Sequence, residues 1–266
     1  MKKNLMVILF LLLIMAIYNY IEISKYKINK VNINSHKISK DIQIVQISDF
    51  HSNKYVNINN ILNDIKAIKP HFIVLTGDMI DHDDKDLTYT LNFIESLIKI
   101  NPKVFYVHGN HEMGNKRGYV FIDKLKELGV IVLENENKII EIDGDVINIC
   151  GLNFYTDSND YEKTVKGINE ENYTILLSHS PDRPLHLLKN KEDLILSGHS
   201  HGGQVRLPII GGILAPGQGF FPEYDKGIYE INDKSILYID SGLGNSVLPL
   251  RFLNRVQFSY IAIKSI

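Results

Sequence analysis

The sequence predicts an α/β protein built around a largely parallel sheet. Three apolar, β-branched runs carry this prediction, at residues 42–47, 72–75 and 104–107. A segment with helical spacing of apolar residues follows the first two runs, and these two segments end at Pro70 and Pro102. Because alternating strands and helices form parallel sheets, the polar residues that follow each strand should meet at one sheet edge, where such folds bind ligands.

The N-terminal segment predicts a membrane anchor. Lys2 and Lys3 precede an uncharged run at 4–21, which is close to the ~20 residues that cross a bilayer as a helix. Cleavage of a signal peptide needs a site of small residues, and only Ala16 is available, so we expect an uncleaved anchor. The two lysines favour an inner N-terminus and a folded domain on the outer face of the cell membrane, although three lysines just after the segment weaken this signal.

The remaining elements follow in order. We expect an anchor at 1–27, a tether leading into a first strand or two at 28–40, and one folded domain at 41–266. Helices are predicted at 58–68, 91–98, 119–128 and 159–167, and later strands at 131–133, 139–149 (a hairpin folded at 143–144), 173–177, 194–196, 227–231, 235–239 and 258–263.

Composition narrows the chemistry. The chain has 266 residues and a net charge of -2, which argues against a dedicated nucleic-acid-binding surface. Its single cysteine, Cys150, excludes an intramolecular disulfide and a thiolate metal cluster, so candidate ligands are His, Asp, Asn and Glu. Nothing in the sequence indicates a protein partner.

Metal-capable side chains follow five of the predicted strands. These are Asp49, His51, Asp78, Asn110, His111, His179, His199 and His201. Each is weak evidence alone, since Asp and Asn after a strand are more often helix caps. Five loops that carry such residues to one sheet edge suit two divalent ions of the Mn, Fe or Zn type.

The same residues form an ordered series of motifs. The series is Asp49-x-His51, Gly77-Asp78-x-x-Asp81, Gly109-Asn110-His111-Glu112, His179 and Gly198-His199-x-His201. It resembles the calcineurin-like metallophosphoesterase superfamily, and the resemblance runs from about Ile42 to the C-terminus. With the anchor, residues 178–181, 201–208 and 241–244 are similar to a membrane-associated bacterial phosphodiesterase branch. The resemblance implies a four-layer α/β/β/α sandwich of two mixed sheets, with the metal site at the strand ends.

The resemblance also implies a role for each residue. Asp49, His51 and His201 would hold one ion, Asn110, His179 and His199 a second ion, and Asp78 would bridge them. His111 would protonate the leaving alkoxide or, alternatively, only orient Asp78, while Asp81 and Glu112 would orient ligand imidazoles. Mn²⁺ is the leading candidate, with Zn²⁺ or Fe²⁺ as alternatives. The other histidines, His36, His71, His82, His108 and His186, are expected to be structural or solvated, with His108 a possible exception because it adjoins the third motif.

The implied activity is hydrolysis of a phosphodiester by a hydroxide held between the two ions. A phosphomonoesterase or a pyrophosphatase on the same site is an alternative, and so is a non-catalytic, metal-stabilised module that binds the cell envelope. The proton donor His111 argues against the last of these. Apolar residues in the segment 211–222 predict either a packed loop or a contact with the membrane, and the second case would favour a lipid-linked substrate.

Overall fold

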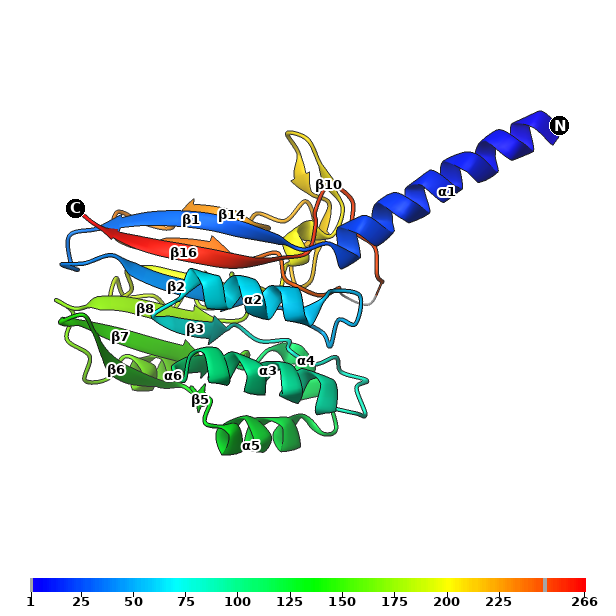
Figure 1. Cartoon of the computed structure of the whole chain (residues 1–266). Helices are drawn as coiled ribbons and strands as arrows, with labels where there is room; N and C mark the ends of the chain where they lie inside the picture. Colours follow the sequence, from blue (N-terminus) through cyan, green and yellow to red (C-terminus); the bar gives the residue numbers. More distant parts are fainter. Residues whose placement is uncertain (1, 246–247) are drawn as a thin grey trace.

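The strands predicted before the first three polar motifs form the centre of a six-stranded sheet. The protein is described here by a computed structural model over residues 2–245 and 248–266 (Figure 1). The order across this first sheet is β1 (Lys27–Ser35), β16 (Gln257–Ser265), β2 (Ile42–Ile47), β3 (Phe72–Leu75), β4 (Val104–Tyr106) and β5 (Ile131–Val132). Strands β2 to β5 are parallel, whereas β16 is antiparallel to β2. The expected mixed sheet is therefore present.

Strand β1 replaces most of the tether expected at 28–40. It pairs with β16 along its whole length and buries Val31 and Ile33 between the sheets, while Asn32 faces outward. The strand is hard to predict from sequence, because its few apolar residues alternate with lysines and asparagines. Its partner lies more than 200 residues away, so only the tertiary fold identifies it as part of the domain.

A second six-stranded sheet faces the first one. Its order is β14 (Gly227–Glu230), β15 (Ile236–Ile239), β9 (Leu194–Ser197), β8 (Tyr173–Ser178), β7 (Asp145–Leu152) and β6 (Glu136–Ile142). The four inner strands are parallel and the two edge strands are antiparallel to their neighbours. The predicted turn of the β6–β7 hairpin is confirmed, since Asp143 and Gly144 both have positive φ, as a two-residue hairpin turn requires.

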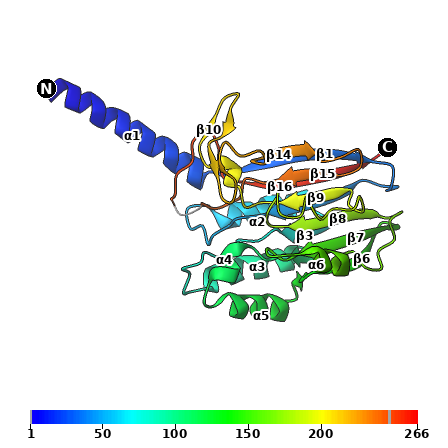
Figure 2. The same cartoon turned by 180° about the vertical axis from the view of Figure 1, so that it is seen from behind.

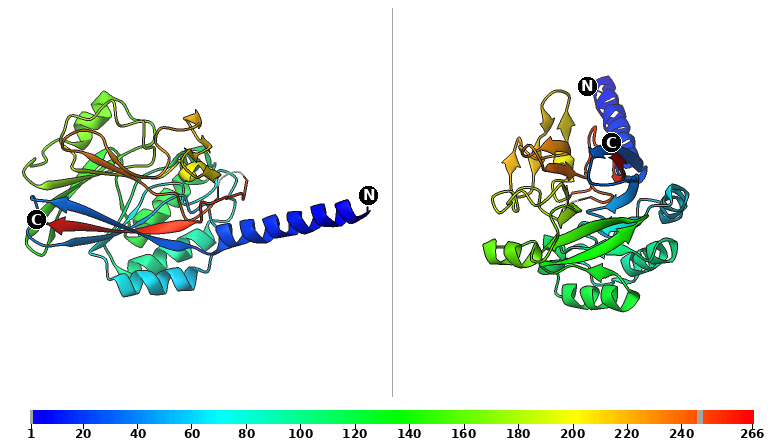
Figure 3. Two further views of the ribbon diagram at one scale, coloured as in Figure 1. Left: turned by 90° about the horizontal axis from the view of Figure 1, so that it is seen from above. Right: turned by 90° about the vertical axis from the view of Figure 1, so that its left-hand side faces the viewer.

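Three apolar cores separate four layers, which confirms the predicted sandwich (Figure 2; Figure 3, right). Helices α2 (Ile58–Ile68), α3 (Thr88–Ile100) and α5 (Gly118–Leu128) cover the outer face of the first sheet. Side chains such as Ile44 and Ile175 pack between the two sheets. The outer face of the second sheet is covered by the short helix α6 (Ser158–Thr164) and neighbouring loops.

Helix α1 (Lys2–Ser24) projects from the domain and contains an 18-residue stretch with a mean hydropathy of 2.3 (Figure 1). It is long and apolar enough to cross a membrane, and its N-terminal part is exposed. Its last turn is docked instead: Glu22 is buried, pairs with Arg255 and accepts the Asn254 N–H at 2.9 Å. The last turn of α1 is thus held by the C-terminal segment of the domain.

Short elements line the end of the domain from which α1 leaves. They are α4 (Asn110–Gly114), η1 (His201–Gly203) and two small hairpins, β10 (Arg206–Leu207) with β11 (Gly211–Gly212) and β12 (Leu214–Ala215) with β13 (Gly219–Phe220). An ion pair of 2.8 Å between Arg206 and Asp225 fastens the hairpins. The aromatic rings of Phe220 and Phe221 stay 73% and 65% exposed. The tip of the segment 211–222 that carries these two residues is therefore not packed against the domain.

Candidate metal centre

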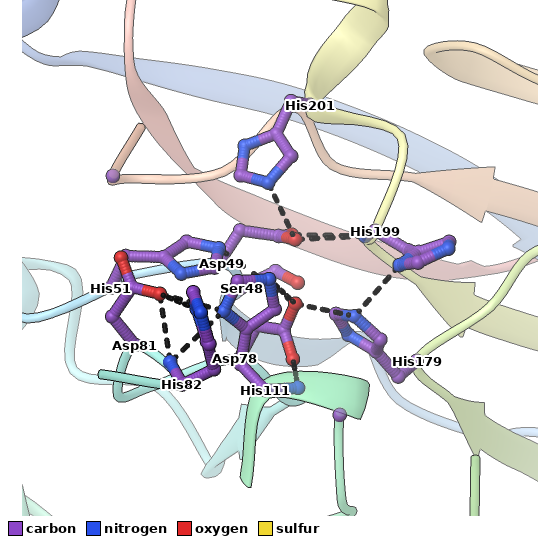
Figure 4. A network of polar contacts seen from close by, with 12 residues as sticks. Ser48, Asp49, His51, Asp78, Asp81, His82, His111, His179, His199 and His201 are labelled. Atoms are coloured by element: carbon purple, nitrogen blue, oxygen red, sulfur yellow. Dashed lines mark hydrogen bonds and ion pairs between the residues drawn. The ribbon is translucent and has the colours of Figure 1, made fainter. Parts of the chain in front are cut away.

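The carboxyl ends of both sheets deliver the predicted ligands to one place (Figure 4). Asp49 follows β2, Asp78 follows β3, His179 follows β8, and His199 follows β9. The two sheets are joined directly here, because the Asp49 carboxylate accepts the His199 N–H at 3.0 and 3.1 Å. The fold therefore makes a single site from loops that are far apart in the sequence.

Three groups of side chains could each hold a metal ion. One potential ligand atom from every member of a group lies within 4.8 Å of the others. The groups are Asp49, His51 and His201; Asp78, His179 and His199; and His51, Asp81 and His111. The first two coincide with the histidine and aspartate sets expected for the two ions, whereas the third was not expected.

Asp78 lies between the first two groups. Its Oδ2 is 3.0 Å from Nε2 of His179 and 3.7 Å from Nε2 of His51. Its other oxygen, Oδ1, accepts the backbone N–H of His111 at 2.9 Å. One carboxylate oxygen thus faces a member of each group, which is the position that a bridging ligand needs.

Burial controls the charge of three imidazoles. Removal from water lowers the pKa of His51 to about 4 and that of His199 to about 3, and it holds the pKa of His201 well below its usual value. These rings are therefore neutral at pH 7, and each offers a nitrogen lone pair. A neutral imidazole is the form that binds a metal ion.

The buried carboxylates of the site differ in their tendency to ionise. Burial raises the pKa of Asp49 to about 7, with opposing effects from the charges of His179 and Asp78. Burial also disfavours ionisation of Asp78, but the charge and hydrogen bond of His179 hold its pKa below the usual range. In turn, burial is outweighed at His179, where Asp78 and Asp49 raise the pKa to about 9. A bound cation beside Asp49 would favour its ionised form.

Buried polar atoms without partners also fit bound cations. Within the described part of the chain, both ring nitrogens of His51 and Oδ1 of Asn110 are buried and lack a hydrogen-bond partner. A buried polar atom without a partner costs folding free energy, and a bound cation would supply a partner for these atoms. His179 is oriented by a 2.7 Å hydrogen bond between its Nδ1 and the Thr76 carbonyl, which directs Nε2 into the site. The residues present therefore fit two divalent cations.

Backbone strain concentrates at the same residues. Five of them have φ between 46° and 69°, a left-handed conformation that costs about 1–3 kcal/mol outside glycine. These are Asp49, His51, Asp78, His199 and His201. Such strain persists where the surrounding structure enforces it, and it is common at functional sites.

Two motif glycines allow the loops to approach the aspartates. A Cβ atom on Gly109 would clash with the Asp78 carboxylate, and one on Gly198 would clash with Asp49 and Ser48. These close approaches explain why glycine precedes Asn110 and His199 in the motifs.

His111 stands at the edge of the centre with one nitrogen on each side. Its Nδ1 is 2.8 Å from Oδ1 of Asp81, and its Nε2 is 3.9 Å from Oδ2 of Asp78. Burial lowers its pKa, but the hydrogen bond to Asp81 and the charge of Asp78 outweigh burial and raise the pKa above the usual value. These contacts stabilise the imidazolium form relative to that of a solvated histidine, which suits a proton donor.

Of the two carboxylates expected to orient imidazoles, only Asp81 contacts one. It binds His111 and also lies 3.1 Å from Nδ1 of His82, which places His82 at the rim of the site rather than apart from it. Glu112 differs: among the described residues its carboxylate accepts backbone N–H groups, those of Asp78, Met79, Ile80 and Gly109. As the third residue of α4 it joins the first turn of that helix to the loop after β3, so it positions backbone rather than an imidazole.

Sequence reasoning missed an aromatic wall beside the second group. The Phe154 ring lies 5.2 Å from the His199 ring and 5.8 Å from the His179 ring, and the Arg183 guanidinium lies 4.3 Å above its centroid. Phe154 follows β7 and so occupies a strand end like the ligands, but an apolar ring gives no ligand signal. His108, the possible exception, faces Glu134 at 3.2 Å.

Known proteins share both the sequence pattern and the fold. Residues 42–203 match the family described as calcineurin-like phosphoesterase. The Bacillus subtilis metallophosphoesterase YkuE is 35% identical over 232 residues, which cover 84% of this chain and 79% of that protein. A Danio rerio protein named transmembrane protein with metallophosphoesterase domain is 24% identical over 274 residues, covering 94% of this chain and 60% of that protein.

A solved structure agrees at the level of fold. The NAD nucleotidase NadN of Haemophilus influenzae superposes with a TM-score of 0.52 at 18% identity, over 77% of this chain and 45% of that protein. The chain thus spans less than half of that nucleotidase.

Proposed function

Because the chain belongs to the calcineurin-like phosphoesterase family and is thus a metal-dependent phosphoric ester hydrolase, we propose that it is a phosphodiesterase. The observation that supports this activity is one shared carboxylate, Asp78, between two ligand groups, with a proton-bearing imidazole, His111, beside them. A binding module would need the ligands but would have no use for the proton donor.

Each side chain then has a defined task. Asp49, His51 and His201 would hold one divalent ion, Asn110, His179 and His199 the other, with Asp78 between them. When bound, such ions activate water and neutralise charge on a phosphoryl group. His179 would give up its proton on loading, whereas His51, His199 and His201 are already neutral.

His111 acts on the leaving group. A diester has an alkoxide leaving group, which needs a proton as its bond to phosphorus breaks. The Nε2 atom of His111 faces the centre, while the Nδ1 atom is held by Asp81. This proton donor supports hydrolysis of esters with poor leaving groups.

Turnover by the full-length chain in detergent tests the activity. With Mn²⁺ it should hydrolyse bis(p-nitrophenyl) phosphate, lose activity on chelation and regain it when Mn²⁺ returns, with Zn²⁺ and Fe²⁺ tested in parallel. Faster hydrolysis of p-nitrophenyl phosphate or pyrophosphate would contradict the diester preference. No turnover despite two bound ions per chain would identify a non-catalytic module. Truncation at residue 27 is unsuitable, because it removes the docked Glu22.

We also propose that α1 anchors the chain in the cell membrane with the domain on the outer face. The length and hydropathy of α1 and the name of the Danio rerio relative support the anchor, and Lys2 and Lys3 support the orientation. Protease added to intact cells should digest the domain; full protection in cells, with digestion after lysis, would reverse the orientation.

The exposed Phe220 and Phe221 support a substrate at the membrane surface. If they contact lipid, replacing both with Ser should lower turnover of a diester presented in vesicles by about 100-fold or more, because burial of each ring in lipid contributes on the order of 1.5–3 kcal/mol. Turnover of a small soluble diester should be unchanged. Tyr119→Ser, an exposed aromatic residue on α5, is the matched control. Equal losses on both substrates would exclude the lipid contact.

A further inference from the structure

An apolar groove lies between α1 and the domain. Its volume is about 390 Å³, within the range of small-ligand sites. Ile14, Met15 and Tyr18 of α1 line one side, and Val205, Leu250 and Phe252 line the other. The Tyr18 and Phe252 rings pack at 5.5 Å, so helix and domain close around the groove.

A separate, polar cavity lies beside the candidate metal ligands. It has a volume of about 310 Å³ and is lined by residues that include His51, Asp81, Lys54 and Pro249. Pro249 belongs to this cavity, whereas the next residue, Leu250, belongs to the groove. One short stretch of chain therefore separates a polar cavity beside the candidate metal ligands from an apolar one.

The side chain of Arg251 reaches from the groove to the candidate metal centre. It lines the groove, yet its Nη2 donates to the Ser241 and Gly244 carbonyls at 2.7 Å and lies 3.5 Å from Nδ1 of His201. Its backbone N–H donates to Asn19 of α1 at 2.8 Å. The metal centre and α1 are thus one arginine side chain apart.

The position of α1 determines what can fill the groove. Its lining residues Ile14 and Met15 belong to the helix that would cross the bilayer and are 47% and 64% exposed. Figure 1 shows α1 leaving the end of the domain to which β3 and β7 point. If α1 crosses the bilayer as proposed, these side chains lie against lipid, and the ligand that suits the groove is a hydrocarbon chain.

We propose that the groove binds an alkyl chain of the substrate while the polar cavity holds its phosphodiester group. This inference rests on the proposed phosphodiesterase activity and names its substrate class: an amphiphilic phosphodiester drawn from the membrane. The apolar lining contributes through burial of methylene groups, and the polar cavity places the ester beside His51 and Asp81.

A chain-length series tests this inference in the full-length protein in phospholipid nanodiscs. The probes are p-nitrophenyl esters of methyl, hexyl and decyl phosphate, used with Mn²⁺ below their critical micelle concentrations. We expect kcat/KM to rise at least tenfold from methyl to decyl, since each buried methylene adds at most about fourfold. Leu250→Asp should flatten this rise, whereas Ile209→Asp, on a fully exposed residue outside the groove, should keep it. The same rise of kcat/KM with chain length in wild type and Leu250→Asp would contradict binding of the alkyl chain in the groove.

A second measurement does not depend on turnover. The only natural cysteine, Cys150, is buried, so Leu250→Cys or Ile209→Cys supplies a single accessible thiol. Decylphosphonate should slow maleimide labelling of Leu250→Cys several-fold but not that of Ile209→Cys, and methylphosphonate should slow neither. Equal effects at both positions, or none, would exclude the groove even if the methyl ester is hydrolysed. Failure of wild type to hydrolyse the methyl ester with any metal would instead contradict the phosphodiesterase activity.

Discussion

Asp78→Ala should remove metal from both ligand groups and reduce turnover to background. Its Oδ2 faces His179 of one group and His51 of the other, so the substitution deletes a shared ligand. Removal of a single oxyanion-hole donor lowers the rate of an enzyme by about 10²–10³-fold, and loss of both ions should cost more than this. Metal content by mass spectrometry of the purified, reloaded variant gives the direct measurement.

Asp49→Ala is the matched control for the bridging role. Asp49 belongs to the group with His51 and His201 but not to the group with His179. This variant should therefore lose one ion and keep the other. Two tightly held ions in Asp78→Ala, or equal metal loss in both variants, would contradict a bridge by Asp78. Circular dichroism spectra would show whether each variant keeps its fold.

His111→Ala should keep both ions and lose turnover by about 10²–10⁴-fold, the usual contribution of a general acid. The loss should be greatest for substrates with poor leaving groups, because p-nitrophenolate departs without a proton. Rates on a series of aryl and alkyl diesters measure this difference. An equal loss across the series would exclude proton donation, and loss of an ion would instead assign His111 to the third ligand group, with His51 and Asp81.

Asp81→Asn provides a test of His111 that leaves the imidazole in place. The Asp81 carboxylate helps to raise the pKa of His111, so its neutral replacement should lower that pKa. A general acid is active below its pKa, and the alkaline decline of kcat should therefore move to lower pH in the variant. An unchanged pH profile with unchanged metal content would show that His111 does not supply the proton in the rate-limiting step.

Much of the centre follows from local sequence order. Asp49, Asp78 and His179 each follow a strand shortly after its last residue. They therefore lie at the carboxyl edge of a sheet, because parallel strands share that edge. The hairpin turn at Asp143-Gly144 also follows from local sequence, because these residue types tolerate the positive φ that the turn needs. Helix α1 is also predictable from local sequence, because its long uncharged, apolar run identifies a helix without any tertiary contact.

Other features depend on contacts that no local pattern encodes. Strand β1 becomes a strand by pairing with β16, and the last turn of α1 docks on the domain because Arg255 pairs with Glu22. Glu112 was expected at an imidazole, but the fold turns it towards backbone amides. Phe154 joins the site through proximity alone.

The sequence by itself determined the chemistry of the site: hard and borderline ligands after parallel strands, with glycines where the backbone approaches Asp78 and Asp49. Only the tertiary structure decided how those ligands group, because the grouping depends on two sheets meeting at their carboxyl ends. It also decided that α1 and Leu250 form a groove one arginine away from the centre. Local order sets which side chains are available; long-range packing sets the distances between them.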